Sequence, residues 1–236
     1  MTQPPFPLVE LPELTTDQMR EVDRIMVDEL HIGLVQMMEN AGRHLAQLAI
    51  HRHHPRTCTV LAGPGGNGGG GLVAARHLAN RGVDVEVVLA APDAMTEVPA
   101  HQLDILHRMG VPIQETPRSA DLVLDALLGY SGRGDPYGRA AELIAWTGKQ
   151  AGAILALDSP SGLDLTTGRI GTPCIRADAT LTLALPKRGL QEVSVVGELF
   201  AADISVPPWV YDRFGLRVTA PFAESPIVRV AGQRLT

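Results

Sequence analysis

Apolar residues recur along this chain at two spacings, and the spacing separates the expected helices from the expected strands. The segment from residue 15 carries an apolar stripe at intervals of three or four residues, which predicts a helix that starts with a capping box at Thr15 and Gln18 and ends at Gly33. A second stripe predicts a helix from residue 34 to the segment 51–54. The first stripe consists of Met19, Val22, Met26 and Leu30, and the second of Met37, Met38, Ala41, Leu45 and Leu48.

Beyond residue 56, short strand-like runs rich in apolar residues alternate with helical patterns. The expected strands are 57–62, 83–90, 111–114, 122–129, 153–158, 178–185 and 197–204, and the expected helices are 72–81 and 100–109. Apolar strands that alternate with helices indicate a parallel sheet with helices on both faces. The predicted fold class is therefore α/β with a mostly parallel central sheet.

The chain divides into one domain with two flanking segments. Residues 1–14 are rich in proline and acidic residues and are expected to form an extended N-terminal arm that packs on the domain or on a partner. Residues 15–208 form the expected domain, and residues 209–236 an irregular C-terminal tail. We find no internal repeat and no second set of strand–helix units.

Composition narrows the possible partners and the compartment. The net charge of −6 over 236 residues argues against nucleic acid or an anionic membrane as the main partner. The two cysteines, Cys58 and Cys174, belong to no CxxC pair and are expected to be reduced and buried. Residues 1–14 lack the pattern of a signal peptide, and no apolar run approaches the length of a membrane span. We expect a cytoplasmic protein.

The glycine-rich stretch 63–71, GPGGNGGGG, joins an expected strand to an expected helix. Residues without side chains let backbone N–H groups face a ligand at a helix start, as in a phosphate cradle. The alternative is a flexible turn with no ligand. Seven glycines in nine residues exceed what such a turn needs.

Two apolar runs each carry one carboxylate. Asp125 lies in the run LVLDALLG, and Asp158 ends the run AILALD. An unpaired buried carboxylate is costly, so each aspartate is expected at the carboxyl edge of the sheet beside a cation or a hydrogen-bond donor. Ligands of open parallel sheets bind at that edge. The segment HRHH at 51–54 is expected on the surface, because adjacent histidines do not share a helix face.

Five separated motifs carry a resemblance to a known family. The segments MENAG (38–42), GPGGNGGGG (63–71), DALLG (125–129), DSPSGLD (158–164) and ALPK (184–187) occur in the order of the NAD(P)H-hydrate epimerase family, the YjeF N-terminal domain, whose corresponding motifs run roughly MENAG, GPGNNGGDG, DAxxG, DxPSGLD and APK. The resemblance covers most of residues 15–208. Two positions differ: Gly66 and Gly70 replace the first asparagine and the aspartate of the glycine-rich motif.

The resemblance implies a three-layer Rossmann-like sandwich, often dimeric, that interconverts the R and S forms of hydrated NADH and NADPH and binds K⁺. A separate ADP- or ATP-dependent dehydratase would then restore the cofactor. The K⁺ ligands implied are Asn67, Asp125 and Ser161. The residues implied to bind the hydrated nucleotide are Gly66, Asn67, Gly68, Gly69, Gly70, Gly129, Tyr130, Ser131, Gly132, Arg133, Gly134, Asp135 and Asp158.

Asp158 is the expected catalytic acid/base. Lys187 is expected to hold a phosphate or stabilise developing charge, with a surface lysine in a turn as the alternative. Two other functions stay open. A nucleotide-binding or scaffold module with altered or lost catalysis would fit the missing aspartate. An ordinary NAD(P) oxidoreductase would fit the GxGxxG pattern, but no acidic residue ends the next strand, where Ala90, Ala91 and Pro92 stand.

Overall fold

The computed structural model describes residues 6–191 and 193–231, and they form a nine-stranded sheet. The strand order is β1-β9-β8-β7-β6-β5-β2-β3-β4, and among these strands only the β8–β9 pair is antiparallel. The strands are β1 (Leu8–Val9), β2 (Thr57–Ala62), β3 (Asp84–Leu89), β4 (Ile113–Gln114), β5 (Leu122–Ala126), β6 (Ala153–Leu157), β7 (Ala179–Leu183), β8 (Glu198–Ala202) and β9 (Ile227–Val230). The predicted fold class, α/β with a mostly parallel central sheet in three layers, is confirmed.

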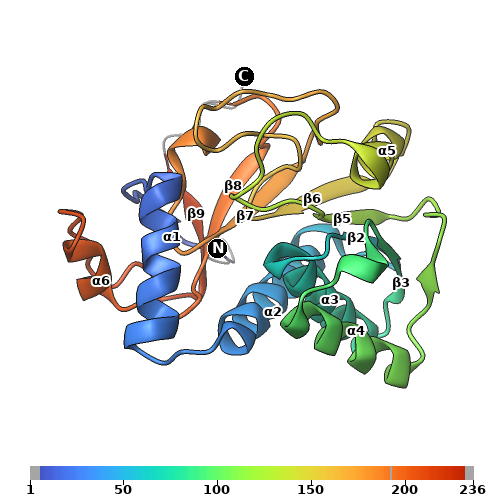
Figure 1. The fold of residues 1–236 in the computed structure, drawn as a ribbon, viewed down its shortest axis with the longest axis horizontal. Helices are drawn as coiled ribbons and strands as arrows, with labels where there is room; N and C mark the ends of the chain where they lie inside the picture. The colour runs from blue at the N-terminus through green and yellow to red at the C-terminus, as the bar shows by residue number, and fades with distance from the viewer. Residues whose placement is uncertain (1–5, 192, 232–236) are drawn as a thin grey trace, which may run out of the picture.

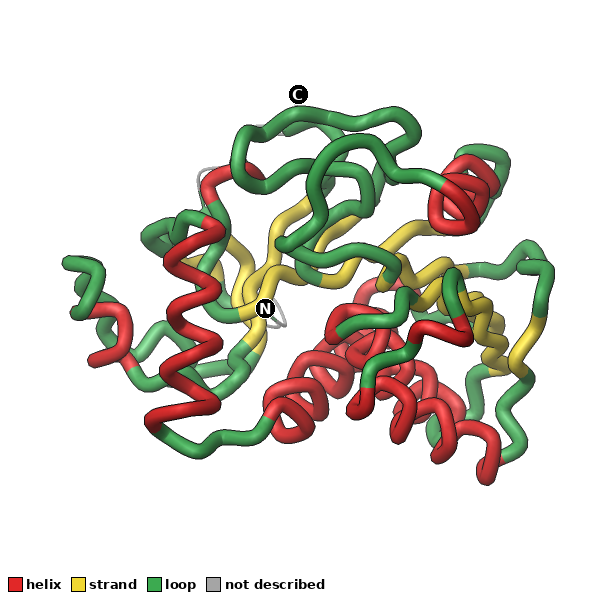
Figure 2. Tube along the Cα trace, viewed as in Figure 1, coloured by secondary structure: helices red, strands yellow, loops and turns green. Residues whose placement is uncertain are grey.

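Helices cover one face of the sheet, and one helix with long loops covers the other. In Figure 1, α2, α3 and α4 lie together on one side of the strands and α5 on the opposite side. Figure 2 shows how much of that second side consists of loops. The helices are α1 (Thr16–Arg24), α2 (Leu34–His53), α3 (Gly66–Ala79), α4 (Glu97–Met109), α5 (Gly138–Thr147) and α6 (Pro208–Asp212), with a π-helical turn at Ile25–Glu29 and 3₁₀ turns at Pro92–Ala94 and Arg188–Leu190.

Alternation along β5 shows how the strands serve both layers. Leu122, Leu124 and Ala126 pack in the cluster under α2, α3 and α4, whereas Val123 points to the cluster under α5. This is the two-residue period of a strand that is buried on both faces. On the second face, Asp125 takes the position after Val123, so the strand brings one carboxylate into the interior.

Both flanking segments join the sheet, which corrects the expected tail. β1, from the N-terminal arm, pairs with β9, from residues that were expected to be irregular. Residues 208–212 are also helical. The arm packs on the domain itself: Phe6 is buried, and Leu14 bridges to Lys187. A four-residue strand carries too short an apolar pattern to predict, because its pairing partners supply most of its stability.

The glycine-rich stretch is mostly helix, which corrects the prediction of a turn through residue 71. α3 begins at Gly66, and its glycines permit close approach. A Cβ on Gly71 would lie 2.5 Å from the Cβ of Ala126, one on Gly70 would lie 2.7 Å from Leu157 Cδ2, and one on Gly68 would collide with the carbonyl oxygen of Gly63. The glycines therefore allow α3 to press against the strands.

The structure also tests the expected helix ends and the expected state of the cysteines. The Thr15–Gln18 capping box is present, but the first helical segment ends at Glu29, and Gly33 instead caps the start of α2. Helix α5 lies in a segment for which no helix was predicted. Both cysteines are free, with Cys58 buried and Cys174 half-buried. In the described part of the chain, no helix is long and apolar enough to span a membrane.

Candidate active site

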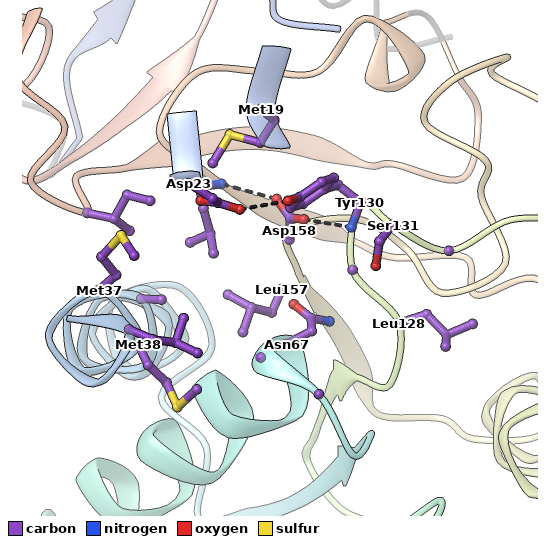
Figure 3. Close-up of a pocket in the computed structure, with 18 of the residues that line it drawn as sticks. Met19, Asp23, Met37, Met38, Asn67, Leu128, Tyr130, Ser131, Leu157 and Asp158 are labelled. Carbon is purple, nitrogen blue, oxygen red and sulfur yellow. Dashed lines mark hydrogen bonds between the residues drawn. The ribbon is translucent and has the colours of Figure 1, made fainter. Parts of the chain in front are cut away.

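A cavity of about 590 Å³ opens at the carboxyl ends of β2, β5, β6 and β7. Helices α1 and α2 form one wall, and the first turn of α3 and the loop after β5 form the other (Figure 3). This is the edge at which parallel sheets bind ligands. The wall from α1 and α2 is mainly apolar, and the polar side chains gather on the side of the strand ends. The residues that line the cavity include Met19, Asp23, Met37, Met38, Gly66, Asn67, Gly129, Tyr130, Ser131, Gly132, Leu157, Asp158 and Lys187.

Asp158 lies directly after β6, in a left-handed backbone conformation with φ of 65°. Aspartate tolerates this region better than most residues, and such conformations concentrate at functional sites. Its side chain is buried, and each carboxylate oxygen has a strong donor: Tyr130 N donates to Oδ2 at 2.9 Å, and Lys187 Nζ donates to Oδ1 at 2.6 Å. The turn therefore aims this carboxylate at the cavity.

Lys187 is fully buried, so the alternative of a surface lysine is wrong. Its Nζ donates to Asp158 Oδ1, to Thr182 Oγ1 at 3.1 Å and to the carbonyl oxygen of Leu183 at 2.8 Å. Three donors thus meet three acceptors. The N-terminal arm fixes this segment, because Leu14 N donates to Pro186 O and Arg188 N donates to Leu14 O.

Asp125 is completely buried in β5 and bound to the DSPSGLD segment. Ser161 donates to it twice, through its backbone N at 2.7 Å and its Oγ at 2.6 Å, and Leu127 N donates at 3.2 Å. Burial raises the pKa of Asp125 to about 6, although these hydrogen bonds act in the opposite direction. Within residues 6–191 and 193–231, no positive charge is found to offset this burial.

Asn67 lies in the first turn of α3 and lines the cavity. Its Oδ1 and Nδ2 are both buried and have no hydrogen-bond partner among the described residues. Gly129 separates Asn67 from Asp158: a Cβ there would lie 3.3 Å from Asn67 Cβ and 3.4 Å from Asp158 Oδ2. An unpartnered amide, an uncompensated carboxylate and a hydroxyl form a set of oxygen donors that suits a hard cation. The described residues contain no cluster of three His, Cys, Asp or Glu side chains that could hold a metal.

The structure brings together part of the predicted substrate-binding set. Gly66, Asn67, Gly129, Tyr130, Ser131, Gly132, Asp158 and Lys187 all line the cavity. Gly68, Gly69 and Gly70 do not, because they are buried within α3. Arg133, Gly134 and Asp135 also lie outside the lining, and the carboxylate of Asp135 instead accepts hydrogen bonds from Arg169 and from Thr172 N. Its contacts hold two loops together.

Sequence reasoning missed Asp23 as a site residue. It lies on α1, lines the cavity and accepts a hydrogen bond from the hydroxyl of Tyr130 at 2.6 Å. Burial raises the pKa of Asp23, while the bond from Tyr130 acts against this. The available signal was its place four residues after Met19, on the same face of the predicted helix. Met19, Met37 and Met38 were assigned to apolar stripes, but they also line the cavity.

Comparison with known proteins gives one family and relatives that the chain matches over most of their length. Residues 34–189 match the family described as "YjeF-related protein N-terminus". The chain is 45% identical over 226 residues to the NAD(P)H-hydrate epimerase of Dehalogenimonas lykanthroporepellens, with 92% of each chain covered. It is 33% identical to the NAD(P)H-hydrate epimerase of Rhodopirellula baltica, with 89% of this chain and 91% of that one covered.

Two further matches differ in length or in kind. The bifunctional NAD(P)H-hydrate repair enzyme Nnr of Moorella thermoacetica is 37% identical over 82% of this chain, which spans 40% of that protein. The crystal structure of yeast ynu0 superimposes with a TM-score of 0.80 at 24% identity and covers 93% of this chain and 100% of its own. At that identity the likeness shows the fold alone.

Proposed function

The chain belongs to the family of YjeF-related protein N-terminal domains, and from that premise we propose that it is an NAD(P)H-hydrate epimerase. This isomerase interconverts the R and S forms of hydrated NADH and NADPH. The observation that carries the proposal is the 45% identity to an epimerase across 92% of both chains. The buried pair of Asp158 and Lys187 in the cavity supplies the chemistry. No finding favours a scaffold without catalysis or an oxidoreductase.

The reaction requires one proton donor and one proton acceptor. The hydrated nicotinamide carries a hydroxyl on the carbon next to the ring nitrogen, and inversion of that carbon needs the C–O or C–N bond to open and re-form from the other face. One group must therefore give a proton and another must take one. No strong nucleophile is needed. The cavity accordingly needs titratable groups at fixed positions.

Asp158 takes the role of acceptor. Lys187 and the backbone N–H of Tyr130 both donate to its carboxylate and fix its position in the cavity. Lys187 uses all three of its donors on neighbouring groups, so it acts by neutralising and orienting Asp158, and a phosphate contact is not needed to satisfy it. The mainly apolar wall from α1 and α2 excludes water around these charges, which strengthens the electrostatic interaction between Asp158 and Lys187.

We propose a K⁺ site between Asn67, Asp125 and Ser161. The unpartnered amide oxygen of Asn67 and the uncompensated carboxylate of Asp125 support it. The bound cation would supply a positive charge that offsets Asp125. Asp125 also holds the DSPSGLD segment through its hydrogen bonds from Ser161, and Gly129 lies between Asn67 and Asp158.

The substrate and partners follow from the same proposal. The ligand is hydrated NADH or NADPH, and a separate ADP- or ATP-dependent dehydratase would consume the epimer that it accepts. A bifunctional repair enzyme of which this chain spans 40% supports that division of work. We also expect a cytoplasmic homodimer. The free thiols Cys58 and Cys174 fit a reducing compartment.

The test uses separated R and S hydrates of NADH. The purified protein should speed their equilibration, followed by chromatography, and an unchanged rate at micromolar protein would refute the function. Asp158→Asn should slow turnover by roughly 10²-fold or more. Asp212→Asn, at an exposed position, is the matched control and should keep the wild-type rate. Near-normal turnover of Asp158→Asn would remove that residue from the mechanism.

A further inference from the structure

A second carboxyl lines the cavity beside the Asp158–Lys187 pair. Asp23 reaches it from α1, and Tyr130 connects the two acids. The Tyr130 hydroxyl donates to Asp23 Oδ2 at 2.6 Å, and its backbone N donates to Asp158 Oδ2 at 2.9 Å. Figure 3 shows Asp23, Tyr130 and Asp158 converging on one place in the cavity. Two carboxyls are therefore held at fixed positions by one residue.

The two carboxyls have opposite surroundings. Asp158 is paired with Lys187 at 2.6 Å. Of the described residues, only Tyr130 hydrogen-bonds the Asp23 side chain, and that bond uses Oδ2. The other charged groups around Asp23 are more distant: Lys187 and Asp158 act with opposite signs, and the Arg20 guanidinium carbon lies 6.0 Å from the centre of the Tyr130 ring. Burial raises the pKa of Asp23.

When two acids in one cavity have environments that favour different protonation states, they are suited to opposite roles. We propose that Asp23, in its protonated form, is the proton donor of the epimerisation and that the Asp158 carboxylate is the acceptor. This inference rests on the proposed function. Tyr130 is a positioning residue, because its hydroxyl occupies Oδ2 and leaves Oδ1 to carry the transferred proton.

The proton transfers balance without any other reactant. Asp158 takes the proton of the substrate hydroxyl as a carbonyl forms and the ring C–N bond breaks. The electron pair of that bond moves to the ring nitrogen, which takes the proton of Asp23. Rotation about the neighbouring C–C bond presents the other face of the carbonyl. In the reverse transfers, Asp158 gives its proton back to the oxygen as the ring closes, and the proton on the ring nitrogen returns to Asp23.

The experiment measures kcat and KM of epimerisation against pH. Asp23→Asn keeps the size of the side chain but cannot donate its proton as an acid, so kcat should fall by roughly 10²-fold with KM within about twofold of wild type. The alkaline limb of the wild-type profile, which reports loss of the Asp23 proton, should disappear. Asp23→Glu should recover part of kcat. Asp28→Asn, at an exposed position on the turn after α1, is the matched control.

Tyr130→Phe gives a second, independent readout. The hydroxyl of Tyr130 lowers the pKa of Asp23, so its removal should move the alkaline limb to higher pH. Infrared difference spectra between wild type and Asp23→Asn follow the same proton without turnover. The band of a protonated carboxyl should be present at acidic pH and lost over the range of the alkaline limb.

The outcomes separate this inference from the proposed function. Wild-type protein that does not speed epimerisation would overturn both. Active wild-type protein with an Asp23→Asn variant that keeps the alkaline limb, or more than about a third of kcat, would overturn the inference alone. A lower kcat with a lower melting temperature and an unchanged pH profile would assign Asp23 a structural role and also overturn it.

Discussion

Replacing Lys187 by methionine tests whether the charge pair holds the site. The Lys187 Nζ and Asp158 Oδ1 atoms lie 2.6 Å apart, and the exposed fractions of the two side chains are 0% and 4%. Methionine keeps the length and apolar stem but removes the charge, which leaves Asp158 buried without its cation. Breaking a buried pair in this way costs about 3–5 kcal/mol of unfolding free energy. The acceptors on Thr182 and Leu183 also lose their donor.

A double-mutant cycle isolates the pair from these other losses. Asp158→Asn combined with Lys187→Met removes both charges, so the double variant should be more stable than the sum of the single changes predicts, by about 2–3 kcal/mol. The chain's other lysine provides a control, since Lys149 is exposed and Lys149→Met should change stability by less than about 0.5 kcal/mol.

The assay is equilibrium unfolding in urea followed by circular dichroism, with midpoints compared at equal slope. Lys187→Met should lower the midpoint strongly, and it should also abolish epimerisation. A Lys187→Met protein within about 1 kcal/mol of wild type would refute the argument that the pair is both buried and coupled. Strict additivity in the cycle would refute the coupling by itself.

Three further predictions concern pH, packing and the cation. Burial lowers the pKa of His44 to about 4, so below about pH 6.5 the native state binds fewer protons than the unfolded state. As the pH is lowered from about 6.5 to about 4, wild-type stability should therefore drop by up to about 3 kcal/mol more than that of His44→Gln, with His101→Gln, at an exposed position, as the control. Parallel curves for wild type and His44→Gln in acid titrations would contradict this. Gly68→Ala should lower the free energy of unfolding in urea by about 1–3 kcal/mol, because the added Cβ would collide with the backbone of Gly63. Gly66→Ala should be tolerated, because the space around that position is open, and equal midpoints for the two variants would contradict the packing argument. Exchange of K⁺ for tetramethylammonium should lower the Tm of the wild-type protein by roughly 2–4 °C per kcal/mol of binding energy lost. The same exchange should leave the Tm of Asn67→Ala unchanged, and equal wild-type Tm values in both salts would argue against the site.

Much of the fold could be predicted from the sequence, because local patterns of apolar residues determine it. The runs that became β2, β3, β5, β6, β7 and β8 are short segments rich in apolar residues, and such segments indicate burial whatever their partners are. A carboxylate within an apolar run is also a local signal. Asp125 and Asp158 were placed correctly at the strand ends for that reason. The order of five motifs then indicated the family.

The misplaced start of α3 and the missed β9 have a common cause. Glycine has low helix propensity, so no local rule predicts a helix from Gly66 onward. That helix forms because glycine lets its backbone approach Ala126 and Leu157. Similarly, Ile227–Val230 becomes a strand because β8 and β1 supply its hydrogen-bond partners. In both cases, residues far away in the sequence determine the local secondary structure.

The sequence by itself determined the strands β2 to β8, the polar residues at their carboxyl ends and the family. Only the tertiary structure decided that Lys187 is buried against Asp158, that Asp23 faces Tyr130 from another helix, and that Gly68 to Gly70 serve packing. These contacts join residues separated by 29 and 107 positions. Periodicity describes which face of an element is buried, but it carries no information about which distant side chain meets it there.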